Sequence, residues 1–171
     1  MGGILEDKIL KVTFRNFLNI HLSTIVLMLV GFGILCYLRF DQYFVQVFVF
    51  FWMLDLLPAV YLHLSYLSKN KGEEYEVRDT ELVWRKGGEK KVYKNHEIEK
   101  IIIHLSPALY RNSNFHLLAI ESYHYAVVKL KTGEELILTC LLAPRIDKSL
   151  KKMKGVLFEK RKRLFCMFIS S

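Results

Sequence analysis

The chain has 171 residues, of which 52% are hydrophobic and 13% aromatic, and its net charge is +8. A soluble domain of this length rarely contains so many apolar side chains, so the composition argues against an ordinary water-soluble protein. The three cysteines, Cys36, Cys140 and Cys166, are far apart and form no C-x-x-C pair. The sequence therefore predicts neither a disulfide framework nor a structural zinc site.

Two long apolar segments lie near the N-terminus, at residues 17–38 and 43–67. A helix over the first would be about 33 Å long, which is enough for a hydrocarbon core of about 30 Å, and the second helix can tilt. Only residues 39–42 separate the two segments, so the sequence predicts an antiparallel transmembrane hairpin. A cleaved signal peptide is the rival interpretation, but the first apolar run is too long and no small-x-small site follows it.

The charges around these segments predict their orientation. Basic residues precede the first segment and follow the second: Lys8, Lys11, Arg15, Lys69, Lys71 and Arg78. The short connection contains one, Arg39. By the positive-inside rule we expect both termini in the cytoplasm and the hairpin in the cell inner (plasma) membrane, with residues 1–16 as a cytoplasmic N-terminal segment.

From residue 73 to residue 171 the pattern changes to short segments with turn signals between them, which is typical of a separate β domain. Gly87-Gly88 and Thr132-Gly133 are the clearest turns. The predicted strands are 75–78, 82–85, 90–93, 98–105, 117–122, 125–131 and 134–142.

The last part of the chain has apolar residues at helical spacing. On a helical projection one arc collects Ile146, Leu150, Met153, Leu157, Leu164 and Phe168, and the lysines fall opposite. We therefore predict a C-terminal amphipathic helix over residues 146–168, weakened near Gly155. The expected fold class is an α+β membrane protein, with a two-helix transmembrane hairpin and an antiparallel β-roll that the C-terminal helix caps.

Several runs in the predicted β domain carry a family resemblance. They are Glu74-Tyr75-Glu76-Val77, Leu82-Val83-Trp84-Arg85, Glu97-Ile98-Glu99-Lys100-Ile101, Val127-Val128-Lys129-Leu130-Lys131-Thr132-Gly133-Glu134 and Ile137-Leu138-Thr139. Over residues 73–165 the chain resembles the bacterial PH-like (bPH, YcxB-like) domains, which often follow two N-terminal membrane helices. The resemblance implies a PH-like roll and a bacterial binding or scaffold module. The insert at residues 106–123 is longer and more aromatic than that pattern needs.

Asp55 is the most unusual residue of the predicted hairpin. It lies at the midpoint of the second helix, with Pro58 one turn later. A carboxylate there costs roughly 2.5 to 3.5 kcal/mol on insertion scales. Antiparallel packing places Ser23 and Thr24 within a turn of it, so we expect a neutral carboxyl hydrogen-bonded at a helix or dimer contact. Recognition of a partner and proton transport are the functional alternatives.

The histidines and cysteines show no arrangement suited to catalysis or to a metal ion. His21 and His63 lie toward the cytoplasmic ends of the two predicted helices and are expected to approach each other by packing. No H-E-x-x-H, Walker-type loop, Gly-x-Ser-x-Gly or zinc spacing is present. The prediction is a protein that is not an enzyme and uses no metal and no cofactor.

Two groups of basic residues are candidates for contact with anionic lipid head groups or a partner. One flanks Gly87-Gly88, where basic residues bind inositol phosphates in the eukaryotic PH domains that this fold resembles, and the other lies on the polar side of the predicted C-terminal helix. The residues are Arg85, Lys86, Lys90, Lys91, Lys148, Lys151, Lys152, Lys162 and Arg163. A plain solvated surface is the alternative for both groups. Nucleic-acid binding is not expected, because no aromatic residues are interleaved with the charges.

The insert supplies a further candidate for partner binding, because polar and aromatic loops often bind partners. Its candidate residues are Tyr110, Arg111, Phe115, Tyr123 and Tyr125. The alternative is a loop that covers the core. The sequence thus favours a membrane-anchored PH-like scaffold that engages a protein partner, another copy of itself or anionic lipid. The other possibility is a small oligomeric membrane transporter or channel component that uses Asp55.

Overall fold

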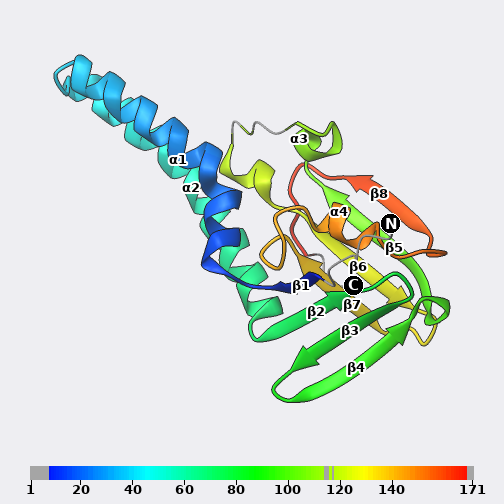
Figure 1. Cartoon of the computed structure of the whole chain (residues 1–171). Helices are drawn as coiled ribbons and strands as arrows, with labels where there is room; N and C mark the ends of the chain where they lie inside the picture. The colour runs from blue at the N-terminus through cyan, green and yellow to red at the C-terminus, as the bar shows by residue number, and fades with distance from the viewer. Residues whose placement is uncertain (1–7, 114–115, 117, 169–171) are drawn as a thin grey trace, which may run out of the picture.

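The computed structural model describes residues 8–113, 116 and 118–168, and it places a helical hairpin beside a β domain (Figure 1). The chain begins with strand β1 (Lys8–Lys11) and continues through the two hairpin helices, α1 (Phe14–Tyr37) and α2 (Gln42–Asn70). The elements that follow are β2 (Glu73–Val77), β3 (Glu81–Lys86), β4 (Glu89–Lys94), η1 (Asn95–Glu97), β5 (Ile98–Leu105), α3 (Pro107–Tyr110), η2 (Ala119–Ser122), β6 (Tyr125–Leu130), β7 (Glu135–Thr139), α4 (Ile146–Leu150) and β8 (Phe158–Lys162).

Local signals set the limits of the two long helices. The Thr13 side chain caps α1 by accepting the Asn16 backbone N–H at 3.2 Å. The Asp41 carboxylate caps α2 by accepting the N–H groups of Tyr43 and Phe44. The predicted pair of apolar helices is confirmed, and by length and composition each is able to cross a membrane.

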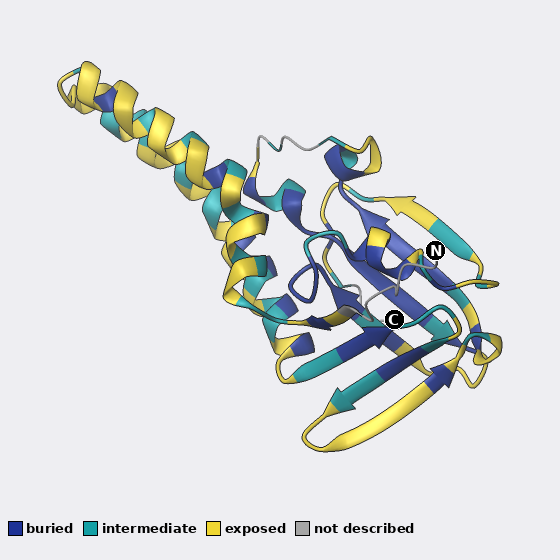
Figure 2. Ribbon diagram, viewed as in Figure 1, coloured by how far each residue is buried: buried dark blue, intermediate teal, exposed yellow. Residues whose placement is uncertain are grey.

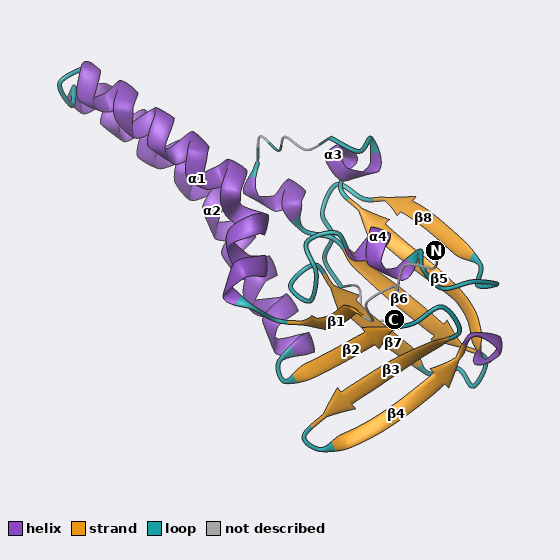
Figure 3. Ribbon diagram, viewed as in Figure 1, coloured by secondary structure: helices purple, strands orange, loops and turns teal. Residues whose placement is uncertain are grey.

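Eight strands form two four-stranded sheets (Figure 3). The first has the order β1-β2-β3-β4 and the second β7-β6-β5-β8, and every pairing is antiparallel except that of β5 with β8. Strand β1 precedes the hairpin but pairs with β2, which follows it, with Lys11 opposite Glu74. Part of the predicted separate segment 1–16 is therefore a strand of the β domain, while residues 1–7 lie outside the described residues.

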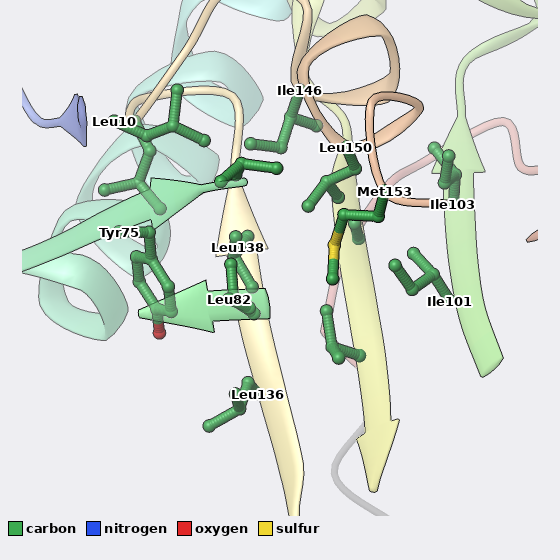
Figure 4. Close-up of a cluster of buried hydrophobic side chains, with 14 of the residues drawn as sticks. Leu10, Tyr75, Leu82, Ile101, Ile103, Leu136, Leu138, Ile146, Leu150 and Met153 are labelled. Carbon is green, nitrogen blue, oxygen red and sulfur yellow. The ribbon is translucent and has the colours of Figure 1, made fainter. Parts of the chain in front are cut away.

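The main core lies between the two sheets (Figure 4). Leu10, Tyr75 and Leu82 enter it from the first sheet, and Ile101 and Leu138 enter it from the second. The side chains of β6 alternate, as the two-residue period of a strand requires, so Ala126, Val128 and Leu130 face this core. A strand with apolar residues on both faces needs a cover on its other side, and the hairpin provides it.

A second buried cluster joins the hairpin to the outer face of the β7-β6-β5 sheet. Ile20 of α1 and Leu62 and Tyr66 of α2 pack there against Tyr125 and Val127 of β6. Figure 2 shows the result, since the end of the hairpin nearest the β domain carries buried residues and most of the projecting end is exposed. The exposed end is apolar, with Phe50, Phe51 and Leu54 among its residues.

The predicted C-terminal helix over residues 146–168 is wrong. Helix α4 ends at Leu150, and residues Phe158–Lys162 form β8, which pairs in parallel with β5. Ile146, Leu150 and Met153 do enter the core as the helical spacing predicted, but Leu157 and Leu164 are exposed. Gly155 adopts φ of 73°, a left-handed conformation that is incompatible with a continuous helix through this position. The open edge of β5 then gains a hydrogen-bonded neighbour.

Two smaller predictions in the insert and in β7 also fail. The stretch predicted as a strand over residues 117–122 contains the 3-10 helix η2, while Leu117 itself lies outside the described residues. The predicted strand over 134–142 is shorter, since β7 ends at Thr139. The residues after it turn beneath the hairpin, where the backbone carbonyls of Leu141 and Leu142 accept the Asn16 side-chain amide.

Candidate functional site

The contact between the hairpin and the insert is made by Asp55. Its two carboxylate oxygens accept the backbone N–H of Ala119 at 2.9 and 3.1 Å. Ala119 is the first residue of η2 and is buried, so its N–H has no access to water. The expected partners on α1 are not used, because the Ser23 hydroxyl has no hydrogen-bond partner among the described residues and Thr24 is simply buried. Pro58 lies inside α2, which continues through it.

Tyr123, at the end of the insert, holds the two helices of the hairpin together. Its hydroxyl lies 3.1 Å from Nε2 of His21 and 3.3 Å from Nδ1 of His63. The two imidazole rings are 5.9 Å apart between centroids, so the expected approach of these histidines is confirmed. Burial raises the pKa of the Tyr123 hydroxyl, which therefore stays protonated and donates to one of the two rings.

Amide side chains attach both ends of the hairpin to the second sheet. Asn70, at the end of α2, is fully buried, donates to the Ile137 carbonyl at 2.8 Å and accepts the Thr139 N–H at 3.0 Å. Asn16, near the start of α1, donates its side-chain amide to the Leu141 and Leu142 carbonyls in the turn that follows β7. The sequence analysis did not single out either residue, although an amide next to an apolar span is a visible signal.

The predicted partner loop divides into a buried part and an exposed part. Tyr123 and Tyr125 are buried, and the Tyr125 ring stacks on His104 with centroids 4.6 Å apart. Tyr110 and Arg111 are exposed. Phe115 lies outside the described residues. The two buried tyrosines thus serve the contact with the hairpin, which agrees with the alternative of a covering loop.

The basic residues of the β3–β4 turn are largely paired with carboxylates. Arg85 binds Glu76 at 2.6 Å and Lys86 binds Glu73 at 3.2 Å. Arg78 also binds Glu76, and these contacts hold the pKa of that carboxyl below its usual range. Lys90 lines the same pocket as Glu74 and Glu89, and Lys91 lies over the Trp84 ring. This turn lies beside the residues that join the hairpin to the first sheet, since Lys11, Val12 and Gly72 line the same pocket.

The second basic group is dispersed, because the helix predicted to carry it does not form. Lys148 belongs to α4, and Lys151 and Lys152 follow its end. Lys148 and Lys152 line a pocket together with residues of α1. Lys162 ends β8, and Arg163 donates its backbone N–H to the Leu105 carbonyl at 2.9 Å. Arg15 and Arg145, which the sequence analysis did not select, lie with Lys148 and Lys152 around one pocket.

The buried histidines and cysteines of the β domain stay uncharged. Burial lowers the pKa of His104 and of His124 to about 4 and raises that of Cys140 and of Cys166 to about 12. These thiols are protonated, and a protonated thiol is a poor nucleophile. In the described part of the chain, no three histidine, cysteine, aspartate or glutamate side chains are grouped as metal ligands would be.

Asp147 is nearly inaccessible, at 2% exposed, and keeps its charge. Burial pushes the pKa of its carboxyl up, but the paired Arg145 outweighs this, and the pKa is lowered overall. Because Arg145 is occupied in this way, its charge is largely cancelled. The positive charge of the adjoining pocket therefore comes mainly from its other cations.

Comparison with known proteins agrees with the two-sheet architecture. A family model described as a PH domain matches residues 9–149, a range that begins in β1, includes the whole hairpin and ends in α4. Comparisons with curated proteins and with solved structures found no match. PH domains are generally non-catalytic binding modules. Because the matched range takes in most of the chain, on both sides of the hairpin, this protein belongs to the PH-domain family.

Proposed function

We propose that this protein is a membrane-anchored PH-domain module that holds a binding surface for a protein partner in a fixed orientation at the cytoplasmic face of the membrane. The observation that carries the proposal is the attachment of the β domain to an apolar hairpin, at the middle of α2 through Asp55 and nearer the base through Asn70 and Tyr123. A flexible tether would leave the domain free to rotate. These buried contacts instead fix one end of the domain toward the membrane.

The pairing of β1 with β2 supports the orientation. The two strands flank the hairpin in the sequence and are hydrogen-bonded neighbours in one sheet. A hairpin that enters a membrane must therefore return to the side from which it started. Lys8, Lys11 and Arg15 at its start and Lys69 and Lys71 at its end favour the cytoplasm as that side.

Strand β4 supports a protein partner. It is the edge strand of the first sheet, and of its residues only Tyr93 is buried. An edge strand offers unpaired backbone groups to an incoming strand. Beside it lies a groove of about 660 Å³ between Lys91–Tyr93 and the β6–β7 turn at Leu130–Thr132. This edge is remote from the hairpin tip, so a membrane-inserted hairpin leaves it accessible (Figure 1).

The contact of Asp55 with Ala119 favours a docking role for Asp55 over a place in a transport path. Both carboxylate oxygens face one backbone N–H of the same chain, so the carboxyl already has a structural partner. Among the described residues, no other titratable side chain hydrogen-bonds to it. We therefore assign Asp55 to the attachment of the domain.

Thiol labelling tests the anchoring. Cys36 is the exposed cysteine of the chain, whereas Cys140 and Cys166 are buried, so a Cys36→Ser background is suited to single added cysteines. A membrane-impermeant maleimide applied to intact cells should label Gln42→Cys at the hairpin tip. Lys90→Cys on the β3–β4 turn should react only after the cells are broken. Release of the protein by alkaline carbonate, or equal labelling at both sites in intact cells, contradicts the anchoring.

Site-specific photocrosslinking tests the binding surface. A photoreactive amino acid at Val92, which is 42% exposed on β4, should give a discrete protein adduct in cells. The same amino acid at Ile25, an exposed apolar residue of α1, serves as the matched control and should crosslink to lipid. The edge of β4 is excluded as the binding surface if the position-92 variant gives no adduct beyond those of the control.

A further inference from the structure

Two adjoining pockets lie at the base of the hairpin, where α1 meets α3 and the segment that leads into α4. The first has a volume of about 220 Å³ and the second about 630 Å³, and they share Asn19, Pro144, Arg145 and Lys148. Together we call them the root groove. The residues that complete it are Arg15, Asn16, Ile20, Leu109, Ser113, His116, Ser122, Ser149 and Lys152.

The charge of the root groove is unbalanced. Arg15, Lys148 and Lys152 have no ion-pair partner among the described residues, and no aspartate or glutamate of that part of the chain lines the groove. The pocket at the β3–β4 turn makes a useful comparison, because Glu73, Glu74 and Glu89 line it together with its four cations, Lys11, Arg85, Lys86 and Lys90. Of these two basic sites, the root groove is the one that attracts an anion.

A buried polar atom inside the groove also lacks a partner. Ser122 is 6% exposed, it lines the first pocket, and its hydroxyl makes no hydrogen bond among the described residues. The Nδ1 atom of His116, in the same pocket, is likewise buried without a partner there. Buried polar groups are normally satisfied, so a hydroxyl donor and a ring nitrogen facing a cationic pocket point to an oxygen-rich ligand.

The position of the groove along the hairpin indicates where that ligand comes from. At 1.5 Å per residue, Arg15 lies about 33 Å and Asn19 about 27 Å from Tyr37, the last residue of α1. A hydrocarbon core is about 30 Å thick, so a spanning α1 places the groove at the level of the lipid phosphates. Leu18 and Leu22, on α1 near these residues, are exposed and apolar, which suits the acyl chains of the same lipid.

We propose that the root groove binds the phosphate of an anionic phospholipid from the leaflet at the base of the hairpin. Lys148, Lys152 and Arg15 supply the charge, and Ser122 donates to a phosphate oxygen inside the first pocket. The site is separate from the pocket of the β3–β4 turn and uses residues of the hairpin itself. It rests on the proposed anchoring, because only an inserted hairpin brings the groove to the head groups.

Native mass spectrometry of the full chain in a mild maltoside detergent tests this site. The probes are equimolar dioleoylphosphatidylglycerol and dioleoylphosphatidylcholine, and the readout is the ratio of the two singly bound complexes. The double variant Lys148→Gln/Lys152→Gln should lower the preference for phosphatidylglycerol at least about tenfold, at about fivefold for each basic residue near a charged surface. Lys90→Gln/Lys91→Gln removes the same charge from β4, outside the root groove, and should leave the preference unchanged.

Two further measurements distinguish a specific lipid site from non-specific electrostatic attraction and from a site for a soluble phosphate compound. Ser122→Ala changes no charge and should still lower the preference about fivefold, because it removes one donor to a charged group. Glycerophosphoglycerol, the same head group without acyl chains, should not displace the lipid at equal concentration. Equal losses in both lysine pairs, an unaffected Ser122→Ala, or full displacement by the soluble head group would each overturn the proposal. The proposed anchoring is tested separately, because release of the protein by alkaline carbonate would contradict the anchoring and not the lipid preference.

Discussion

Asp55 of α2 and Ala119 of the insert are joined by a hydrogen bond in which both carboxylate oxygens lie within 3.1 Å of one backbone N–H. The carboxylate thus satisfies the first N–H of η2 in place of an ordinary capping residue. Asp55, which the sequence places inside a predicted span as a possible proton carrier, is in the folded chain part of the contact between hairpin and domain.

Replacing Asp55 by alanine should destabilise the protein. The buried Ala119 N–H would lose its acceptor, which costs about 1 to 3 kcal/mol, or about 2 to 4 °C in Tm per kcal/mol for a chain of this size. Asp55→Asn keeps an acceptor oxygen and should lose less. Thermal unfolding in detergent, followed by tryptophan fluorescence, gives the comparison, with Gln46→Ala on the exposed part of α2 as control. An Asp55→Ala protein as stable as the wild type would contradict the docking role.

Removing the Tyr123 hydroxyl should loosen the contact of the insert with both helices. Tyr123→Phe leaves at least one ring nitrogen of His21 or His63 without its partner, at a cost of about 1 to 2 kcal/mol. The matched control is Tyr110→Phe, since Tyr110 is 44% exposed. Limited proteolysis within residues 106–123 should become faster in the first variant alone. Equal rates in both would show that the hydroxyl does not secure the insert.

Acid should destabilise the β domain through His124. Its pKa is about 4 in the folded protein and about 6.5 in an unfolded chain, so the unfolded state binds the proton more tightly. The free energy of unfolding therefore falls as the pH drops from about 6.5 toward 4, by about 3 kcal/mol for this fully buried group, and is unaffected above that range. His104, with a pKa also lowered to about 4, acts in the same direction.

Melting curves between pH 7.5 and 4.5 measure this effect. His124→Gln should flatten the dependence of Tm on pH without abolishing it, because His104 still titrates. His96→Gln, at an exposed position, should leave the dependence as in the wild type. If His124→Gln keeps the full pH dependence, the acid sensitivity comes from other groups.

The strand β8 can be tested with proline at adjacent positions. Ile101 donates to the Leu157 carbonyl, and Arg163 donates to the Leu105 carbonyl. In a parallel pair, every second residue of a strand directs its backbone N–H and C=O to the neighbouring strand. The N–H of Arg161 therefore points to β5 and that of Lys160 points away from it. Arg161→Pro should therefore cost about 2 kcal/mol more than Arg161→Ala, whereas Lys160→Pro should cost little. Equal losses at both positions would argue for a helix.

The parts of the fold that depend on local pattern were predictable from the sequence. Strand β5 has the predicted bounds, 98 to 105, because its β-branched run is enclosed by clear breaks. The two helices are recognisable from composition alone. Strand β8 was not predictable, because its partner β5 is far away in the sequence and the spacing of Ile146, Leu150 and Met153 continues an apparent helical period into it.

The candidate sites were predictable only in part, for the same reason. The hairpin position of Asp55 followed from the sequence, but its partner belongs to an insert whose place depends on tertiary packing. Lys148 and Lys152 were selected as lipid contacts on a predicted helix over residues 146–168, which does not form. They nevertheless lie beside Arg15, because the turn after β7 brings them there. The types of these residues therefore indicated the candidate site better than the secondary structure that was predicted for them.

The return of the chain from α2 to a strand beside β1 has a consequence for biosynthesis. Strand β1 leaves the ribosome before the hairpin, and β2, its neighbour in the first sheet, leaves after it. The N-terminal strand must wait, with Leu10 uncovered, until both helices have been made and the chain has come back. Under the proposed anchoring, domain folding therefore follows insertion, and a molecule whose hairpin fails to insert keeps an open sheet edge that quality-control proteases and chaperones can recognise.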